Sequence, residues 1–315
     1  MRVLITGASG FAGGHLARAC ADAGDQVTGI SRRGVSAAGD ARPVDLRVSA
    51  DVRAAVREAS PDVVYHLAAL SSVGRSWEDP GGTVQANMTS DTNLLEAVRH
   101  EAPQARLVWV SSCEVYGSAA SLPAREDAPL LPASPYAVSK TAGEQLAGVY
   151  GQAYGLDVIR ARPFNHAGPG QLPIFILSSL AHQAAESRLA GESKLRVVTG
   201  NPKTRRDFTD VRDVARAYRM LASEAEPGIY NVSSARSISA AEQVRLLAEL
   251  VAPIEVEHVV DPARVRSHEV MDLSGANDRI REATGWRPEI PFRQTMLDTL
   301  HWWEHELTNA GALSN

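Results

Sequence analysis

Three side chains that could move a proton and orient a substrate oxygen lie in the middle of the chain. Tyr136 and Lys140 are four residues apart, so a helix that begins near Pro135 would place both on one face. A nearby ammonium stabilises a phenolate, so the phenol, with an ordinary pKa of about 10, could exchange a proton with a substrate hydroxyl or carbonyl. Ser112 follows the apolar residues 107–110 and would hydrogen-bond the same oxygen. The pattern predicts redox chemistry at a carbon–oxygen bond.

A glycine-rich segment near the N-terminus could hold the phosphates of a dinucleotide. Its glycines are spaced three residues apart, between a short apolar run and a helical pattern. Glycines allow a tight turn and let backbone N–H groups approach a pyrophosphate at a helix N-terminus. This spacing is the one found in short-chain dehydrogenases. The residues predicted to contact the cofactor here are Gly7, Ser9, Gly10, Phe11, Ala12 and Gly13.

The residues after the second apolar run indicate which dinucleotide is bound. NAD-binding proteins usually carry an acidic residue here, which accepts from the ribose 2′-OH. This chain has Arg32 and Arg33 instead, which would suit a 2′-phosphate. We therefore expect NADP, with NAD as the alternative if the two arginines are simply solvated. Asp45 and Leu46, at the end of a predicted third strand, would hold the adenine; an ordinary turn aspartate is the alternative.

Short apolar runs alternate with helical patterns through the first half of the chain. The predicted buried strands are residues 3–5, 27–30, 63–67, 107–110 and 158–161, and the predicted helices are residues 15–22, 52–58, 87–100 and 135–154. This alternation predicts an α/β fold with a doubly wound parallel sheet, the Rossmann architecture.

The alternation weakens after about residue 164, where Pro and Gly become frequent. We expect a dinucleotide-binding domain at residues 1–164 and a smaller, mixed nucleotide-sugar-binding part at residues 165–315. The boundary is soft, because the last strands of the sheet are expected from the second half. Residues 308–315 resemble a loose tail.

Composition excludes several classes of partner. A net charge of -5 argues against a general nucleic-acid or anionic-membrane binder. The apolar stretch at the N-terminus is too short for a signal peptide, and no later run approaches the length of a membrane span. The two cysteines, Cys20 and Cys113, fit neither a metal cluster nor a disulfide framework. We expect a soluble protein of the reducing cytoplasm, without a metal.

Several motifs resemble the extended short-chain dehydrogenase/reductase family of the NAD-dependent epimerase/dehydratase type, over essentially the whole chain. They are HLAA at residues 66–69, LAALSSV at 67–73, SW at 76–77, PFNHAGPGQ at 163–171, RDFTDVRD at 206–213 and RSHEV at 266–270. Within the family, these segments are most similar to GDP-4-dehydro-6-deoxy-mannose reductases, with GDP-mannose 4,6-dehydratases as near relatives. Members commonly dimerise through two helices packed as a bundle, so the resemblance implies a homodimer.

The resemblance implies further contacts. The residues that would line the cofactor are Leu67, Ala68, Ala69, Pro163 and Asn165, together with Tyr136 and Lys140. Those that would contact the nucleotide sugar are Ser71, Ser72, Ser112, Asn165, Arg206, Arg266 and Glu269. Arg206 and Arg266 would bind the diphosphate, and Glu269 the ribose hydroxyls. The alternative for each arginine is a salt bridge to an acid such as Asp207 or Asp213.

Two departures from the family pattern bear on function. Ser90 and Asp91 occupy positions where the family usually has a glycine and a threonine, and we expect no functional effect. Cys113 replaces the Asp of the Asp-Glu pair in glucose-type 4,6-dehydratases, and a thiol is a poor general acid. Mannose-type dehydratases also lack this Asp but keep the Glu, so Glu114 leaves dehydration open.

The leading hypothesis is therefore NADPH-dependent reduction of the C4 keto group of a GDP-linked 4-keto-6-deoxy sugar. The alternatives are 4,6-dehydration with Glu114 as the base, and 4-epimerisation through a transient keto sugar. A cofactor-sensing regulator without catalytic activity is disfavoured, because such proteins typically lose the tyrosine or the lysine.

Overall fold

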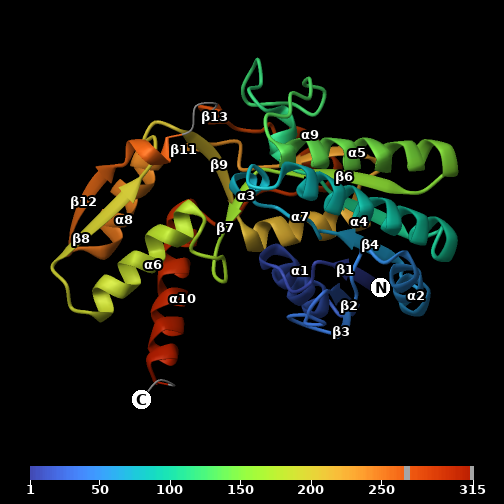
Figure 1. Ribbon diagram of the computed structural model, residues 1–315, viewed down its shortest axis with the longest axis horizontal. Coiled ribbons are helices and arrows are strands. Elements are labelled where there is room, and N and C mark those ends of the chain that lie inside the picture. Colours follow the sequence, from blue (N-terminus) through green and yellow to red (C-terminus); the bar gives the residue numbers. More distant parts are fainter. Residues whose placement is uncertain (266–269, 313–315) are drawn as a thin grey trace.

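A seven-stranded parallel sheet forms the centre of the protein, whose structure is a computed structural model that describes residues 1–265 and 270–312 (Figure 1). The strand order is β10-β6-β5-β4-β1-β2-β3. Its strands are β1 (Arg2–Thr6), β2 (Gln26–Ser31), β3 (Asp40–Pro43), β4 (Val63–His66), β5 (Arg106–Val110), β6 (Val158–Pro163) and β10 (Gly228–Val232). The five strands predicted from apolar runs all lie in this sheet, which confirms the predicted doubly wound fold.

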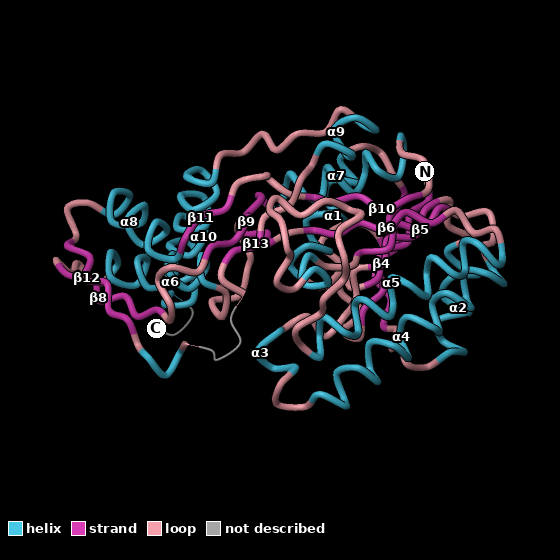
Figure 2. The backbone as a smooth tube through the Cα atoms, turned by 90° about the horizontal axis from the view of Figure 1, so that it is seen from above, coloured by secondary structure: helices cyan, strands magenta, loops and turns pink. Residues whose placement is uncertain are grey.

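Helices cover both faces of the sheet, as Figure 2 shows. One face packs against α1 (Phe11–Asp22), α7 (Val211–Glu224) and α9 (Asp278–Thr284), and the other against α2 (Ser49–Ala59), α4 (Pro80–Glu101) and α5 (Pro135–Tyr154). Apolar side chains such as Leu16, Tyr218 and Leu94 are buried in these two layers. Their burial supplies the main stabilisation of the sheet.

The second half of the chain builds a smaller mixed part beside the sheet (Figure 1). Its strands are β7 (Asn165–Ala167), β8 (Lys194–Thr199), β9 (Arg205–Asp210), β11 (Ser237–Ser239), β12 (Glu255–Val260) and β13 (Asp272–Leu273), and its helices are α6 (Ile176–Leu189), α8 (Ala240–Val251) and α10 (Phe292–Ala312). α7 and β10 also come from this half but join the large sheet.

The expectation of a loose tail from residue 308 was wrong for residues 308–312. Helix α10 continues to Ala312, because Trp303 and Leu307 pack against the apolar core shared with α6 and α8.

The carboxyl ends of the parallel strands meet at one edge of the sheet. Thr6 at the end of β1 pairs with His66 of β4, which pairs in turn with Trp109 of β5. The strand order reverses between β1 and β4, and in open α/β sheets ligands bind at this switch point. Two short helices also lie there, α3 (Val73–Ser76) and the 3-10 helix η1 (Cys113–Tyr116).

Candidate active site

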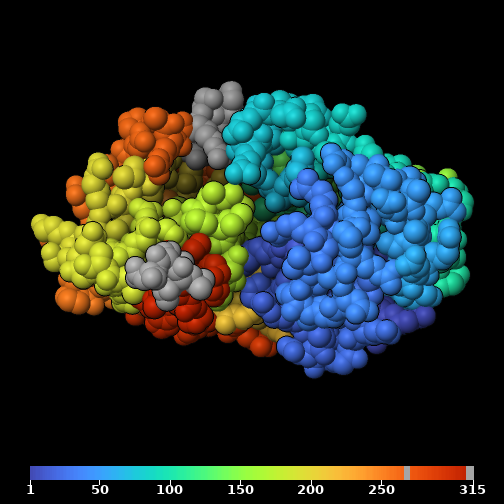
Figure 3. All heavy atoms as spheres, turned by 60° about the horizontal axis from the view of Figure 1, so that its bottom comes forward, coloured from blue at the N-terminus to red at the C-terminus, as the bar shows by residue number. Residues whose placement is uncertain are grey.

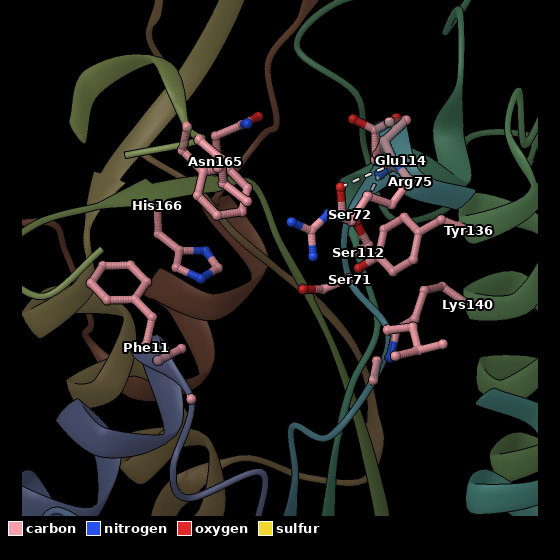
Figure 4. A pocket seen from close by; sticks show the side chains of 18 of the residues that line it. Phe11, Ser71, Ser72, Arg75, Ser112, Glu114, Tyr136, Lys140, Asn165 and His166 are labelled. Atoms are coloured by element: carbon pink, nitrogen blue, oxygen red, sulfur yellow. Dashed lines mark hydrogen bonds between the residues drawn. The ribbon is translucent and has the colours of Figure 1, made fainter. Parts of the chain in front are cut away.

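A cleft of about 2000 Å³ opens at this edge, between the large sheet and the smaller part (Figure 3). A pocket for one small ligand usually measures about 300–1,000 Å³, so this cleft has room for two large ligands side by side. All predicted cofactor and substrate residues within residues 1–265 line it. Arg266 and Glu269 lie outside the described residues. Figure 4 shows Phe11, Asn165 and His166 on one side and Ser112, Tyr136 and Lys140 on the other.

The glycine loop has the shape that a bound pyrophosphate requires. Gly7 has φ +73°, and an added Cβ there would lie 3.0 Å from the backbone of Ala68. At Gly13, an added Cβ would lie 2.2 Å from the carbonyl oxygen of Gly7. Helix α1 begins after Gly10 without a side-chain cap. Its first backbone N–H groups therefore point toward the cleft as donors for an anion, and the loop fits a dinucleotide.

The two arginines after β2 differ in their surroundings. The side chain of Arg33 reaches back over the glycine loop and donates to the carbonyl oxygen of Ser9 at 2.9 Å. Arg32 is exposed and lines the same end of the cleft. Asp45 accepts from the backbone and guanidinium of Arg47, which lowers the pKa of Asp45 to about 2. The cleft therefore presents cations where a ribose 2′-phosphate would lie.

Ser112 and Tyr136 come from different elements but face the same part of the cleft (Figure 4). Ser112 is the N-cap of η1, and its Oγ accepts from the backbone N–H of Glu114 at 3.2 Å. Tyr136 stands in the first turn of α5, where Pro135 follows the N-cap Ser134. The hydrogen bond from Glu114 uses a lone pair of Ser112 Oγ and not its proton, so the hydroxyl can still donate to a substrate oxygen.

Lys140 lies one turn beyond Tyr136 and is buried, with 3% of its surface exposed. Its Nζ donates to the carbonyl oxygen of Val110 at 2.6 Å, which ties α5 to the end of β5. An ammonium has three donors, so two remain for the cleft. Burial lowers the pKa of Lys140, while Asp91 and Glu144 act in the opposite direction.

The pKa of Tyr136 is raised, not lowered as the spacing of tyrosine and lysine suggested. Burial of the phenol is the largest cause, and it outweighs a side-chain interaction with Ser112 that lowers the pKa. Desolvation disfavours the charged form of any acid, so the phenol keeps its proton at neutral pH. This protonation state suits a proton donor.

A buried ion pair anchors helix α5, which carries Tyr136 and Lys140, to the sheet. Glu144 of α5 and Arg162 of β6 have exposed fractions of 0% and 2%, and they approach within 2.6 Å. Arg162 also donates to the hydroxyl of Tyr116 at 2.8 Å and lies over the Tyr116 ring. These contacts hold α5 against the strand that leads to Asn165 on the other side of the cleft.

Cys113 and Glu114 stand beside Ser112 at the cleft. Cys113 is 3% exposed and packs with Val115 and Phe164, and burial raises its pKa well above the ordinary value. A buried thiol with a raised pKa remains protonated and is a weak acid for expelling a hydroxyl as water.

The smaller part contributes polar groups to the far end of the cleft. Arg206 donates to the carbonyl oxygens of Arg205 and Val270, both at 2.8 Å. Within the described residues it forms no ion pair: Asp207 accepts from Ser234 instead. Asp213, the other predicted alternative, accepts from Arg216. The charge of Arg206 is therefore available for an anion such as a diphosphate.

Further predicted residues complete this end of the cleft. Asn165 Oδ1 is buried and has no hydrogen-bond partner within residues 1–265 and 270–312, as expected of a group that awaits a ligand. Ser72 caps α3 by accepting from Arg75 N at 3.3 Å, and Ser71 is exposed beside it.

Sequence reasoning did not assign a site role to several residues that line the cleft, among them Arg75, Gln243 and His166. Arg75 of α3 places a guanidinium near Ser112, as Figure 4 shows. Gln243 of α8 is 2% exposed, and its Oε1 has no hydrogen-bond partner in the described chain. His166 stacks on Phe11 with ring centroids 5.9 Å apart. His166 stood inside the family motif at residues 163–171, whereas no local pattern singles out Gln243.

A Rossmann sheet, a glycine loop after its first strand and a serine, tyrosine and lysine at its carboxyl edge define the extended short-chain dehydrogenase/reductase class. The sequence profile of the family described as "GDP-mannose 4,6 dehydratase" matches residues 4–299, and the chain belongs to this family.

Relatives of several activities match over nearly the full length. The chain is 37% identical to the GDP-6-deoxy-D-mannose reductase of Pseudomonas aeruginosa, covering 96% of this chain and 97% of the relative. It is 31% identical to a UDP-glucose 4-epimerase of Mycolicibacterium smegmatis, covering 97% and 99%. A solved structure of RMD from Pseudomonas aeruginosa complexed with NADPH superposes with a TM-score of 0.86 at 34% identity, covering 97% and 100%.

Proposed function

We propose that this protein is an NADPH-dependent reductase of the C4 keto group of a GDP-linked 4-keto-6-deoxy sugar. The observation that carries the proposal is the buried Tyr136 that faces the same part of the cleft as Ser112, in a cleft with room for two large ligands. The full-length similarity to a GDP-6-deoxy-D-mannose reductase supports the choice of substrate.

The residues of the chain divide the reaction among them. Bound at the glycine loop, NADPH would supply the hydride that reduces C4 of the sugar. Tyr136 donates its proton to the C4 oxygen as charge develops there, and Ser112 donates a hydrogen bond to the same oxygen. Lys140 then stabilises the phenolate that remains on Tyr136. Burial of the phenol and the ammonium excludes water and strengthens both interactions.

The nucleotide end of the substrate would lie against the smaller part. We assign the diphosphate to Arg206, whose charge lacks a carboxylate partner in the described chain, and to Asn165, whose Oδ1 has no hydrogen-bond partner there. Arg266 and Glu269 remain proposed ligands of the nucleotide on the strength of the resemblance alone. Charge-assisted hydrogen bonds contribute about 1.5–3 kcal/mol each, so two such contacts would provide much of the nucleotide affinity.

A 4,6-dehydratase is the second candidate, because Glu114 lines the cleft next to Ser112. In that reaction the C4 hydride would pass to bound NADP and later return to C6, Glu114 would remove the proton from C5, and the C6 hydroxyl would leave as water. Cys113 stands next to Glu114 and is a weak acid, so it disfavours a dehydratase mechanism that needs a second acid beside the glutamate to expel water.

A 4-epimerase would use Tyr136 first to accept and then to donate a proton at C4, and it would release no reduced sugar.

One set of incubations separates these functions. The purified protein is incubated with the GDP-linked 4-keto-6-deoxy sugar and NADPH, and separately with GDP-mannose without a reductant, and the products are identified by NMR. We expect loss of NADPH absorbance and a reduced deoxysugar in the first incubation and no keto sugar in the second. Keto sugar formed from GDP-mannose alone would establish the dehydratase and refute the reductase.

We further propose a dinucleotide-binding domain at residues 1–164 and a nucleotide-sugar-binding part at residues 165–315, a homodimer, and a cytoplasmic location. Val138, Val149 and Tyr154 leave 45–52% of their surface exposed on α5, as an interface would require. Two buried free thiols fit a reducing compartment. Sedimentation analysis tests the dimer and cell fractionation the location. No helix in the described residues is long and apolar enough to cross a membrane.

A further inference from the structure

A buried chain of hydrogen bonds lies behind the catalytic lysine. Thr6 ends β1, His66 ends β4 and Asp91 lies in the middle of α4, and none is more than 2% exposed. Thr6 Oγ1 lies 2.8 Å from His66 Nδ1, and His66 Nε2 lies 2.8 Å from Asp91 Oδ1. None of the three residues lines the cleft, so the chain does not bind substrate directly.

The direction of each hydrogen bond follows from Thr6. Its Oγ1 accepts from the backbone N–H groups of Leu67 and Ala68 at 3.2 and 3.1 Å, so both lone pairs are used. The hydroxyl proton must then go to His66 Nδ1, which leaves the ring proton on Nε2 to be donated to Asp91. Burial lowers the pKa of His66, so the ring is neutral and does not cancel the charge of Asp91.

Asp91 also faces the catalytic helix. Its Oδ2 is buried without a hydrogen-bond partner in the described chain. An added Cβ at Gly143 of α5 would lie 2.0 Å from this oxygen, so only glycine leaves room for it. Lys140 is three residues before Gly143 and therefore lies on the same face of α5.

We propose that Asp91 is a positioning residue: its buried side chain, held by His66, faces the turn of α5 that carries Lys140 and supports the Lys140 ammonium from behind the cleft. Asp91 acts through Lys140 and touches neither ligand. The proposal rests on the proposed function, because the charge of Lys140 matters where Tyr136 transfers a proton. It replaces the expectation that Asp91, where related chains usually have a threonine, has no functional effect. A threonine would supply no negative charge.

The other ionisable groups around Lys140 do not serve this purpose. Glu144 on α5 is already paired with the Arg162 guanidinium from β6. Cys113 and Glu114 of η1 raise the pKa of Tyr136 instead, and Tyr218 of α7 interacts with Tyr136 rather than with Lys140. His66 of β4 is neutral. Among the groups that raise the pKa of Lys140 against burial, Asp91 contributes more than Glu144.

The effect of Asp91 on pH dependence has a definite sign. Reduction requires the proton of Tyr136 and the ammonium of Lys140, so activity falls as pH rises through either pKa. Without the Asp91 charge, the ammonium loses its counter-charge and the phenolate loses a repulsion, so the pKa of both groups falls. Both changes move the alkaline limb of the pH–rate profile to lower pH.

The test is the pH profile of kcat/KM for Asp91→Asn with NADPH and the keto sugar. Asparagine keeps an acceptor for His66 while it removes the charge. We expect the alkaline limb to move down by about one pH unit, with activity reduced about tenfold above the limb and unchanged below it. Glu96→Gln is the matched control. It also removes a carboxylate from α4, but the Glu96 carboxylate accepts a hydrogen bond from Tyr150 and does not face Lys140. Its profile should coincide with that of the unmutated protein.

A second measurement needs no substrate. The chain has three lysines, Lys140, Lys194 and Lys203, so an NMR titration of protein labelled at the lysine side chain resolves Lys140 directly. Its midpoint should be lower in Asp91→Asn, and also in Asp91→Thr, which removes the charge with a smaller side chain. Unchanged midpoints, or activity lost by one factor at every pH, would overturn the proposal. If the unmutated protein reduces no keto sugar, the proposed function fails. The lysine titration still tests the effect of Asp91 on Lys140 in that case.

Discussion

Arg32 offers a clean test of how the protein selects its cofactor. Its guanidinium is exposed at the cofactor end of the cleft and forms no hydrogen bond or ion pair in the described chain, whereas Arg33 donates to the carbonyl oxygen of Ser9. Removing Arg32 therefore withdraws one cation from a ligand without disturbing the glycine loop. Removing Arg33 withdraws a cation and also frees the loop.

The magnitude follows from the number of contacts. One charge-assisted hydrogen bond to a phosphate contributes about 1.5–3 kcal/mol, and exposure places Arg32 at the lower end. Arg32→Ala should therefore weaken NADPH about tenfold and leave NADH unchanged. Arg33→Ala should weaken both cofactors through the shared pyrophosphate loop, and NADPH about tenfold more than NADH through the lost cation. The double variant should lose about a hundredfold in NADPH-to-NADH preference.

Fluorescence titration of each variant with NADPH and NADH measures these affinities directly. The preference of the unmutated protein for NADPH should also shrink as ionic strength rises, because solvent-exposed charges are screened. Equal affinity of the unmutated protein for the two cofactors would refute the reasoning. So would an Arg32→Ala variant that weakens both cofactors to the same extent.

Three further substitutions test the catalytic side of the cleft. Tyr136→Phe keeps the packed ring but removes the proton, so single-turnover hydride transfer from NADPH should fall by about 10²–10⁴ while the fold survives; a loss of only a few-fold would place the proton donor elsewhere. Glu114→Gln should cost little in steady-state reduction, because reduction takes no proton from C5. A drop of about 10²–10⁴ there would instead favour the dehydratase. Glu144→Gln should lower the free energy of unfolding in urea by about 3–5 kcal/mol, since it leaves the Arg162 cation buried without its partner. A change below about 1 kcal/mol would show that the pair does not anchor α5.

Local patterns were sufficient to predict the fold, and the site residues that they singled out within residues 1–265 line one cleft. The alternation of apolar runs with helical periodicity identified five strands of the large sheet, because each strand must bury both faces under helices. The glycine spacing predicted a phosphate loop at the end of β1, and the structure shows a turn there so tight that only glycine fits at Gly13. Tyr136 and Lys140 were readable because a helical turn brings residues four apart together.

Other features depend on desolvation and on contacts between segments far apart in the chain. The raised pKa of Tyr136 follows from burial, which no spacing of residues reports. Arg206 lacks a carboxylate partner in the described chain because its neighbour Asp207 turns to Ser234 instead.

The sequence by itself determined the doubly wound sheet, the glycine loop and the tyrosine–lysine pair, because these depend on residues within a few turns of one another. Only the tertiary structure decided what Asp91 does. His66 and Gly143 lie 25 and 52 residues from it along the chain, yet the packing of β4, α4 and α5 brings all three together behind Lys140. A carboxylate enclosed there keeps a strong field that water would screen at the surface, so its effect follows from burial rather than from its place in a motif.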